Sequence, residues 1–216
     1  MKREEFNQWR EQYREMTFKE NQEWYDRLEK DHPWQQHFDA TKVADFIRHT
    51  STQLGSVRIL ELGGWKGDLA EIIRKNYPNV WSNIVYWDNH DICLTAIEKN
   101  VCHDPKYNAF GIDRQLWELA MLLRPYNIFI GSHVLEHLTT SEIKQLIPFL
   151  VKYKIQYLYL HVPITEQALG EKIWNNYYGN HILEIGWVQL EQLLRKYKYT
   201  PLRKYHDHIR TFKYEG

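Results

Sequence analysis

The sequence predicts an α/β fold, in which helices cover both faces of a doubly wound, mostly parallel sheet that follows an N-terminal helical extension. Three observations predict this fold. From residue 57 onward, short apolar runs alternate with segments of helical periodicity. The run at 57–62 is short and largely apolar, as buried parallel strands between two helix layers are. The length of 216 residues suits one such domain with a short extension.

The first fifty residues differ in pattern from the rest of the chain. Residues 1–31 are dense in charge, and their apolar side chains recur at roughly helical spacing. We expect one or two amphipathic helices there, and a further helix at 39–49. The predicted division of the chain is therefore a helical extension or lid at residues 1–50 and a sheet domain at residues 51–216.

The remaining elements follow in order along the sheet domain. The helix after the fourth strand should open with a capping box, in which Thr139 and Glu142 satisfy each other's backbone amides. A final hairpin should turn at Asp207, so that only the last of seven strands is antiparallel to the others. The expected strands cover residues 57–62, 83–87, 109–112, 127–131, 155–162, 201–205 and 208–214, and the expected helices cover residues 68–77, 92–100, 116–123, 139–151 and 188–197.

The composition disfavours several classes of partner. Lys+Arg and Asp+Glu both number 28, so a nucleic acid or an anionic membrane is not expected as a partner, although a local basic patch remains open. Cys93 and Cys102 have neither metal-ligand nor disulfide spacing, which fits a reducing cytosol. The N-terminus has no signal-peptide pattern, and no apolar run is long enough to span a bilayer. We therefore expect a cytoplasmic protein.

The strongest local signal is a glycine turn directly after the first strand. Residues 59–68 read ILELGGWKGD, which places the carboxylate of Glu61 and then three glycines at the carboxyl end of the sheet. A phosphate-binding loop needs GxxxxGK[ST], which is absent. A dinucleotide fingerprint needs GxGxxG, and Gly63, Gly64 and Gly67 have a different spacing. A tight turn without any ligand remains an alternative.

Two segments together resemble the class I S-adenosylmethionine-dependent methyltransferases. The E-x-G-x-x-x-G pattern from Glu61 to Gly67 resembles motif I of that family, with Trp65 where the family usually has a third glycine. Residues 126–138, YNIFIGSHVLEHL, resemble the family's fourth strand and the turn after it, with Asn127 in place of the usual Asp. The resemblance covers roughly residues 55–165. It implies a Rossmann-like, seven-stranded fold and S-adenosylmethionine as the cofactor.

The resemblance also implies which residues bind that cofactor. In the family, the motif I acid serves the ligand's ammonium group and the glycines admit its methionine and ribose portions. An acid at the end of the second strand should hold the two ribose hydroxyls, and Asp88 is the first choice with Asp91 as the alternative. The cofactor-binding residues are expected to be Glu61, Gly63, Gly64, Gly67, Asp88, Asp113 (opposite the adenine amino group), Ser132 and His133.

Several histidines follow predicted strand ends or lie in the late irregular segment. His137 is the candidate catalytic residue, because a neutral imidazole suits a general base if the acceptor must lose a proton. A purely structural role for His137 in the turn remains the alternative. His133-x-x-Glu136-His137 with a later His181 also loosely resembles the metal site of small-RNA 2′-O-methyltransferases. We predict no metal site, since Val-Leu-Glu-His-Leu also occurs in the family without a metal.

The leading hypothesis is therefore an S-adenosylmethionine-dependent methyltransferase that acts on an O or N atom of a small-molecule acceptor. The aromatic N-terminal helices and residues 174–181 would shape the acceptor pocket. One alternative is a metal-assisted RNA-end 2′-O-methyltransferase. Another is a non-catalytic methyltransferase-like binding module whose pocket is closed by Trp65. The sequence leaves the acceptor, the methylated atom and the oligomeric state open.

Overall fold

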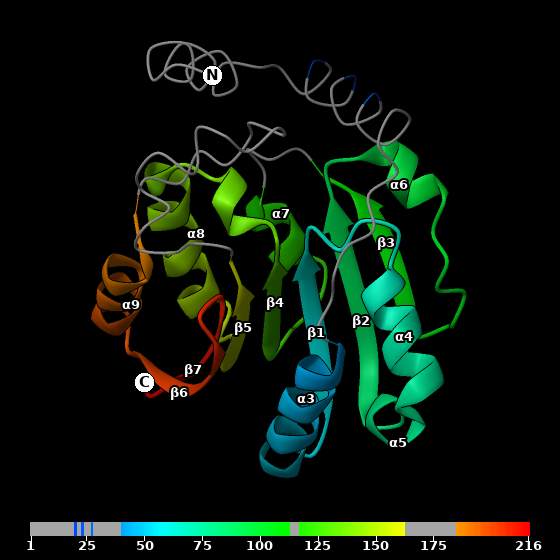
Figure 1. Ribbon diagram of the computed structural model, residues 1–216, viewed down its shortest axis with the longest axis horizontal. Helices are drawn as coiled ribbons and strands as arrows, with labels where there is room; N and C mark the ends of the chain where they lie inside the picture. Colours follow the sequence, from blue (N-terminus) through cyan, green and yellow to red (C-terminus); the bar gives the residue numbers. More distant parts are fainter. Residues whose placement is uncertain (1–19, 21–22, 24–26, 28–39, 113–116, 163–184) are drawn as a thin grey trace.

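The computed structural model describes Glu20, Glu23, Arg27 and residues 40–112, 117–162 and 185–216. These residues form a seven-stranded sheet with helices on both faces (Figure 1). The strands are β1 (Val57–Leu62), β2 (Ile84–Asp91), β3 (Tyr107–Gly111), β4 (Ile128–Ser132), β5 (Tyr157–His161), β6 (Tyr199–His206) and β7 (Ile209–Tyr214). The helices are α3 (Ala40–Leu54), α4 (Asp68–Asn76), α5 (Pro78–Trp81), α6 (Leu94–Glu98), α7 (Trp117–Leu122), the short 3-10 helix η1 (Leu135–His137), α8 (Thr140–Lys152) and α9 (Trp187–Lys196).

The strand order is β3-β2-β1-β4-β5-β7-β6. Strands β1 to β5 pair in parallel, whereas β7 is antiparallel to both of its neighbours, β5 and β6. The predicted sheet, parallel except for its final strand, is therefore confirmed. The order reverses at β1, which lies between β2 and β4, and ligands of open α/β sheets bind at the carboxyl ends of the strands beside such a reversal.

The core has two layers because successive side chains of a strand point to opposite faces. On β1, Ile59 packs with α3, α4 and α5, whereas Leu60 packs with α7, α8 and α9. The predicted capping box of α8 is confirmed: Glu142 N donates to Thr139 Oγ1 at 3.1 Å, and Thr139 N donates to Glu142 Oε2 at 2.6 Å. Among the described residues, no helix is long and apolar enough to cross a membrane.

Helix α3 is part of the sheet domain. Val43, Ala44, Phe46 and Ile47 are buried against β1 and its neighbours. The helix continues to Leu54, so the predicted division between residues 50 and 51 falls inside it. The amphipathic helices expected in residues 1–31, and their role as a lid, lie outside the described residues apart from three isolated positions.

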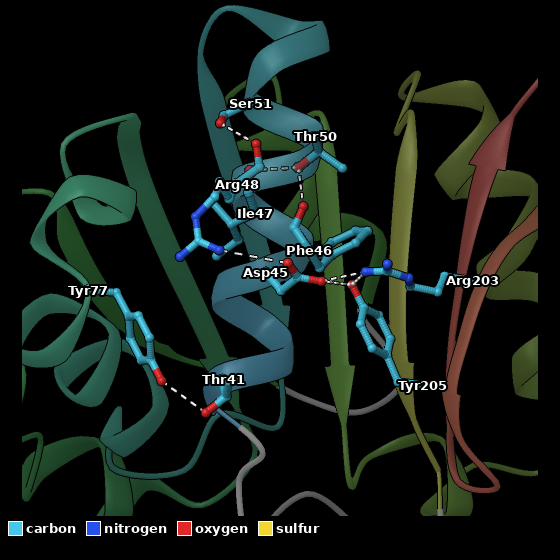
Figure 2. Close-up of polar contacts among 10 residues, drawn as sticks. All are labelled: Thr41, Asp45, Phe46, Ile47, Arg48, Thr50, Ser51, Tyr77, Arg203 and Tyr205. Carbon is cyan, nitrogen blue, oxygen red and sulfur yellow. Dashed lines mark hydrogen bonds and ion pairs between the residues drawn. The ribbon is translucent and has the colours of Figure 1, made fainter.

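Polar contacts fix α3 at both of its sides (Figure 2). The Asp45 carboxylate accepts hydrogen bonds from Arg203 Nη1 and from the Tyr205 hydroxyl on β6. At its first turn, the Thr41 hydroxyl lies 2.9 Å from the Tyr77 hydroxyl, just before α5. The ion pair is exposed and contributes little energy by itself, so these contacts orient a helix that apolar burial holds in place.

Strand β2 is longer than the sequence pattern indicated, and this matters for the site. The predicted strand ends at Trp87, whereas the observed strand continues to Asp91. Its polar end resembles a loop in a hydropathy pattern. Parallel pairing on both sides, with Leu62 opposite His90 and Gly111 opposite Asp91, keeps it extended. Asp88 therefore lies within the strand and Asp91 at its carboxyl end, which corrects the strand boundary on which the choice of Asp88 depended.

Candidate functional site

The glycine loop at residues 63–67 joins β1 to α4 at the carboxyl edge of the sheet. Gly63 and Gly67 have φ values of 75° and 77°, which glycine adopts without strain. Trp65 also has a positive φ, 53°, and its side chain is buried against Cys93 and Ala96 of the α6 segment. The indole therefore packs under α6, at the position where the family's pattern has a glycine.

Side chains at the end of β2 hold the backbone of this loop. Asn89 Oδ1 accepts from Gly64 N at 2.9 Å, and Asn89 Nδ2 donates to Trp65 O at 3.1 Å. Asp91 Oδ2 accepts from Trp65 N at 2.8 Å. The amides of residues 64 and 65 are thus already engaged, unlike the free amides with which a phosphate-binding loop holds its ligand. This geometry agrees with the absence of a phosphate-loop motif.

Glu61 lies directly beneath the loop and is fully buried. Trp87 Nε1 donates to its Oε2 at 2.8 Å, but Oε1 has no hydrogen-bond partner among the described residues. The pKa of Glu61 is raised to about 8, mainly by burial and partly by the nearby Asp91 and Asp68 carboxylates, against the lowering effect of the Trp87 hydrogen bond. A buried carboxyl group with one free oxygen suits a cationic ligand group.

The glycines allow the loop to lie this close. A Cβ on Gly64 would lie 2.6 Å from Glu61 Oε2, and a Cβ on Gly63 would lie 2.8 Å from Val134 Cβ, just beyond β4. A Cβ on Gly67 would lie 2.5 Å from the Tyr107 hydroxyl. All three predicted glycines therefore line a turn that a larger residue would displace.

We expect Gly67→Ala to destabilise the protein much more than Gly55→Ala. Both glycines have positive φ, 77° and 69°, so both substitutions cost about 1–2 kcal/mol of backbone strain. The Gly67 Cβ would also overlap Tyr107, at a further cost of about 1–3 kcal/mol, whereas nothing lies within 4 Å of a Cβ on Gly55. Urea unfolding of the two variants measures the difference. Equal losses would mean that the turn adapts to a side chain.

The two candidate ribose-binding acids have different surroundings. The Asp88 carboxylate accepts from the Tyr126 hydroxyl at 2.7 Å and Asn108 Nδ2 at 2.8 Å, and it pairs with Arg124 Nε at 2.8 Å. The Asp88 carboxylate is therefore part of a polar cluster with these three side chains, on one face of the sheet. Asp91 lies at the strand end beside the glycine loop, and burial raises its pKa to about 6 against the lowering effect of hydrogen bonds from Cys93 N and Trp65 N.

The end of β4 places Ser132 and His133 next to the loop. The carbonyl oxygen of Ser132 would lie 3.8 Å from a Cβ on Gly63, so β4 and the loop are adjacent. His133 has a positive φ of 55°, and its ring lies 4.1 Å from that of His161 at the end of β5. His133 Nδ1 is 3.4 Å from Glu136 Oε1. The His133 and His161 rings therefore lie side by side at the ends of the adjacent strands β4 and β5.

The other predicted residues are only partly described. His137 ends η1 with a half-exposed side chain, and its amide donates to Val134 O at 3.1 Å. Asp113 and His181 lie outside the described residues. Within residues 40–112, 117–162 and 185–216, no three carboxylate, imidazole or thiol side chains are grouped so that they could hold a metal ion.

Sequence reasoning missed two residues that shape the site. Asn89 holds the loop backbone at the consecutive residues Gly64 and Trp65, and Trp87 supplies the one described side-chain hydrogen bond to Glu61. Trp87, Asn89 and Asp91 occupy every second position of β2, so their side chains lie on the same face of the strand. A longer β2 with strict alternation of side chains is the signal that would have revealed them.

Comparisons with known proteins support the same fold. No protein-family model and no curated protein sequence matches the chain. The methyltransferase domain of the bacterial protein CtHen1-CN is 14% identical, with a TM-score of 0.55 over 79% of this chain and 96% of that chain. An O-methyltransferase family protein from Burkholderia thailandensis is 10% identical, with a TM-score of 0.59 over 81% of this chain and 56% of that chain. The N-methyltransferase NodS from Bradyrhizobium japonicum WM9 is 12% identical, with a TM-score of 0.53 over 82% of this chain and 96% of that chain.

The chain therefore has the class I S-adenosylmethionine-dependent methyltransferase fold, as its two sequence motifs implied. Identities this low establish the fold, and the chemistry has to be argued from the site.

Proposed function

We propose that the protein is an enzyme that transfers a methyl group from S-adenosylmethionine to an O or N atom of a small-molecule acceptor. One observation carries the proposal: the glycine loop presses on the buried Glu61, whose Oε1 has no partner among the described residues, where β1 lies between β2 and β4. The structural neighbours are methyltransferases, which supports the same activity. We also propose a cytoplasmic location, as the composition led us to expect.

The residues around the loop fit the chemical groups of S-adenosylmethionine. Glu61 would face its ammonium group, and the compact turn of Gly63, Gly64 and Gly67 would admit its methionine and ribose portions. We assign the ribose hydroxyls to Asp91, because Asp91 ends β2 beside the loop whereas the Asp88 carboxylate is occupied within the sheet. Asp113 would face the adenine amino group, and Ser132 and His133 would border the cofactor at the end of β4.

The bound cofactor would supply an electrophilic methyl group on a sulfonium, and the protein would mainly position the acceptor in line with it. His137 is the proposed general base for an acceptor that must lose a proton. The His133 and His161 rings lie at the ends of the adjacent strands β4 and β5, so the acceptor would approach an edge rich in imidazole. An imidazole is neutral over much of the physiological range and can accept such a proton.

A metal-assisted RNA-end 2′-O-methyltransferase is the second candidate. The contact between His133 and Glu136 favours it, since these residues belong to the alternative metal set. The metal-free enzyme stays first, because the set offers a single carboxylate, Glu136, and a hard ion such as Mg²⁺ prefers oxygen ligands.

We expect S-adenosylmethionine to bind with micromolar affinity, a binding free energy of roughly 8 kcal/mol. Isothermal titration calorimetry measures it directly. NAD⁺ is the matched control ligand, and it should give no binding heat because the loop lacks the dinucleotide spacing. The absence of both heat and thermal stabilisation at millimolar S-adenosylmethionine would favour the non-catalytic module with a closed pocket.

A further inference from the structure

Two turns at the carboxyl ends of α8 and α9 carry the same three residues, Lys-Tyr-Lys. They are Lys152–Lys154 and Lys196–Lys198. In both turns the last lysine has a positive φ, 58° at Lys154 and 63° at Lys198. This left-handed conformation after a helix is one that glycine or asparagine usually occupies.

The two turns flank the end of β7. Tyr214 N donates to Gln156 O at 2.8 Å, and Glu215 N donates to Lys198 O at 2.9 Å. The turns therefore lie at the edge where β5 begins, opposite the edge that holds the glycine loop. In Figure 1 this edge lies near the marked C-terminus, at the foot of the sheet. The five residues of β5 separate the two edges by roughly 16 Å.

The lysines of these turns form a patch of unpaired positive charge. Lys152, Lys154, Lys196 and Lys198 are all exposed, and none of them forms an ion pair with a carboxylate of the described residues. The nearby Glu215 carboxylate already lies 3.6 Å from Lys213 Nζ. Four neighbouring positive charges, none of them in an ion pair with a described carboxylate, repel each other, so a bound anion would stabilise them.

Helix stability explains only half of this arrangement. Lys152 and Lys196 are the last residues of their helices, where a positive charge interacts favourably with the helix dipole. Lys154 and Lys198 lie beyond the helices, in a conformation that is unfavourable for any residue with a Cβ. Neither helix requires a lysine there.

Tyrosine rings alternate with the lysines. Tyr153, Tyr197 and Tyr214 are each half-buried against the α8–α9 side of the core, which holds the rings in place and leaves part of each exposed. Lys152 Nζ already lies 5.2 Å from the centre of the Tyr153 ring. Cations that follow a phosphate backbone, together with ordered rings on which bases stack, are typical of sites for single-stranded nucleic acid. An acidic peptide would use the lysines but has no bases to stack.

We propose that this Lys-Tyr-Lys patch binds single-stranded nucleic acid through its phosphates, with base stacking on the tyrosines. The overall balance of 28 basic and 28 acidic residues does not indicate this patch, because the excess of positive charge is local. The proposal is independent of the proposed function: the patch lies at the edge of the sheet away from the glycine loop, so the bound strand is a partner and not the methyl acceptor.

Fluorescence anisotropy with a labelled 12-nucleotide oligouridylate tests the proposal across about 25–200 mM salt. Four phosphate contacts predict a slope of about −3 for the logarithm of the association constant against the logarithm of salt concentration. Lys154→Glu/Lys198→Glu should weaken binding at least tenfold and reduce the slope to about −1.4. The control double variant, Lys99→Glu/Lys144→Glu, makes the same charge change at exposed lysines elsewhere and should retain affinity within threefold.

The tyrosines need a separate variant, because charge alone would also attract an acidic protein. Tyr197→Ala should weaken oligouridylate binding at least fivefold with the salt slope unchanged, and Tyr197→Phe should restore it because the ring is kept. Thermal melting of each variant confirms that it is folded. No binding at 25 mM salt, or equal losses in the two double variants, would overturn the proposal. Tighter binding of deca-glutamate than of oligouridylate would also overturn it, in favour of an acidic protein partner.

Discussion

Replacing Asp91 with alanine is expected to weaken the binding of S-adenosylhomocysteine about 10- to 150-fold, or about 1.5–3 kcal/mol. Asp91 ends β2, and its two oxygens already hold Trp65 N and Cys93 N at 2.8 Å each. The remaining acceptor capacity of a carboxylate allows both ribose hydroxyls to donate to it. Calorimetry on the purified variant gives the affinity, and a urea melt gives any accompanying loss of stability.

A ligand analogue separates ribose binding from support of the loop. The wild-type protein should bind 2′,3′-dideoxy-S-adenosylhomocysteine more weakly than the parent ligand, because the two hydroxyls are missing. Asp91→Ala should bind both ligands about equally, since the partner of those hydroxyls is gone. If the variant still discriminated between the two ligands as the wild type does, Asp91 would support the loop only, and the ribose would bind elsewhere.

Asp88 provides the matched comparison on the same strand. Asp88→Asn keeps the shape of the side chain but removes the charge that faces Arg124, whose side chain is one-third exposed. We expect a loss of stability of about 1–3 kcal/mol with little change in ligand affinity, because the carboxylate is occupied by Tyr126 and Asn108 inside the sheet. The opposite result, normal stability with lost affinity, would restore the assignment that the sequence favoured.

The sequence was sufficient wherever a local pattern determines the structure. Strand β1 was predicted to the residue, and the capping box of α8 was correct, because apolar runs and capping residues act over a few positions. The helix predicted at residues 68–77 ends at Asn76, and Pro78 begins α5, as proline at a first helical position can. These elements depend on few long-range contacts.

The polar residues at the end of β2, which hold the glycine loop, could not be predicted in the same way. The end of β2 has the polar pattern of a loop, and only its pairing with β1 and β3 keeps it extended. In those pairs the partner residues are 28 positions apart for β1 (Leu62 with His90) and 20 positions apart for β3 (Asp91 with Gly111). The hydrogen bond from Trp87 to Glu61 spans 26 residues and has no counterpart in a local motif. The family resemblance predicted the glycine loop. The side chains that hold the loop in place could be identified only from the tertiary structure.

Replacing Glu61 with glutamine should make the protein progressively more stable than wild type as the pH rises from about 5 to about 8.5. Burial raises the pKa of Glu61 to about 8 in the folded protein, from an ordinary value near 4.5. Between these values the native state holds a proton that the unfolded state has lost. Wild-type stability therefore falls with rising pH, by at most about 1.4 kcal/mol per pH unit from this group.

Glutamine removes this titration but keeps an oxygen that can accept from Trp87 Nε1. The nearby Asp91 carboxyl, whose pKa is raised to about 6, titrates in both proteins, so its effect largely cancels in the difference. Urea unfolding at several pH values should therefore show the gap between variant and wild type growing by about 2–4 kcal/mol. Glu98→Gln, at an exposed glutamate in α6, measures the effect of removing a carboxylate at the surface. A gap that stayed constant with pH would show that Glu61 is already ionised in the free protein, so that its buried charge has a partner before any cationic ligand arrives.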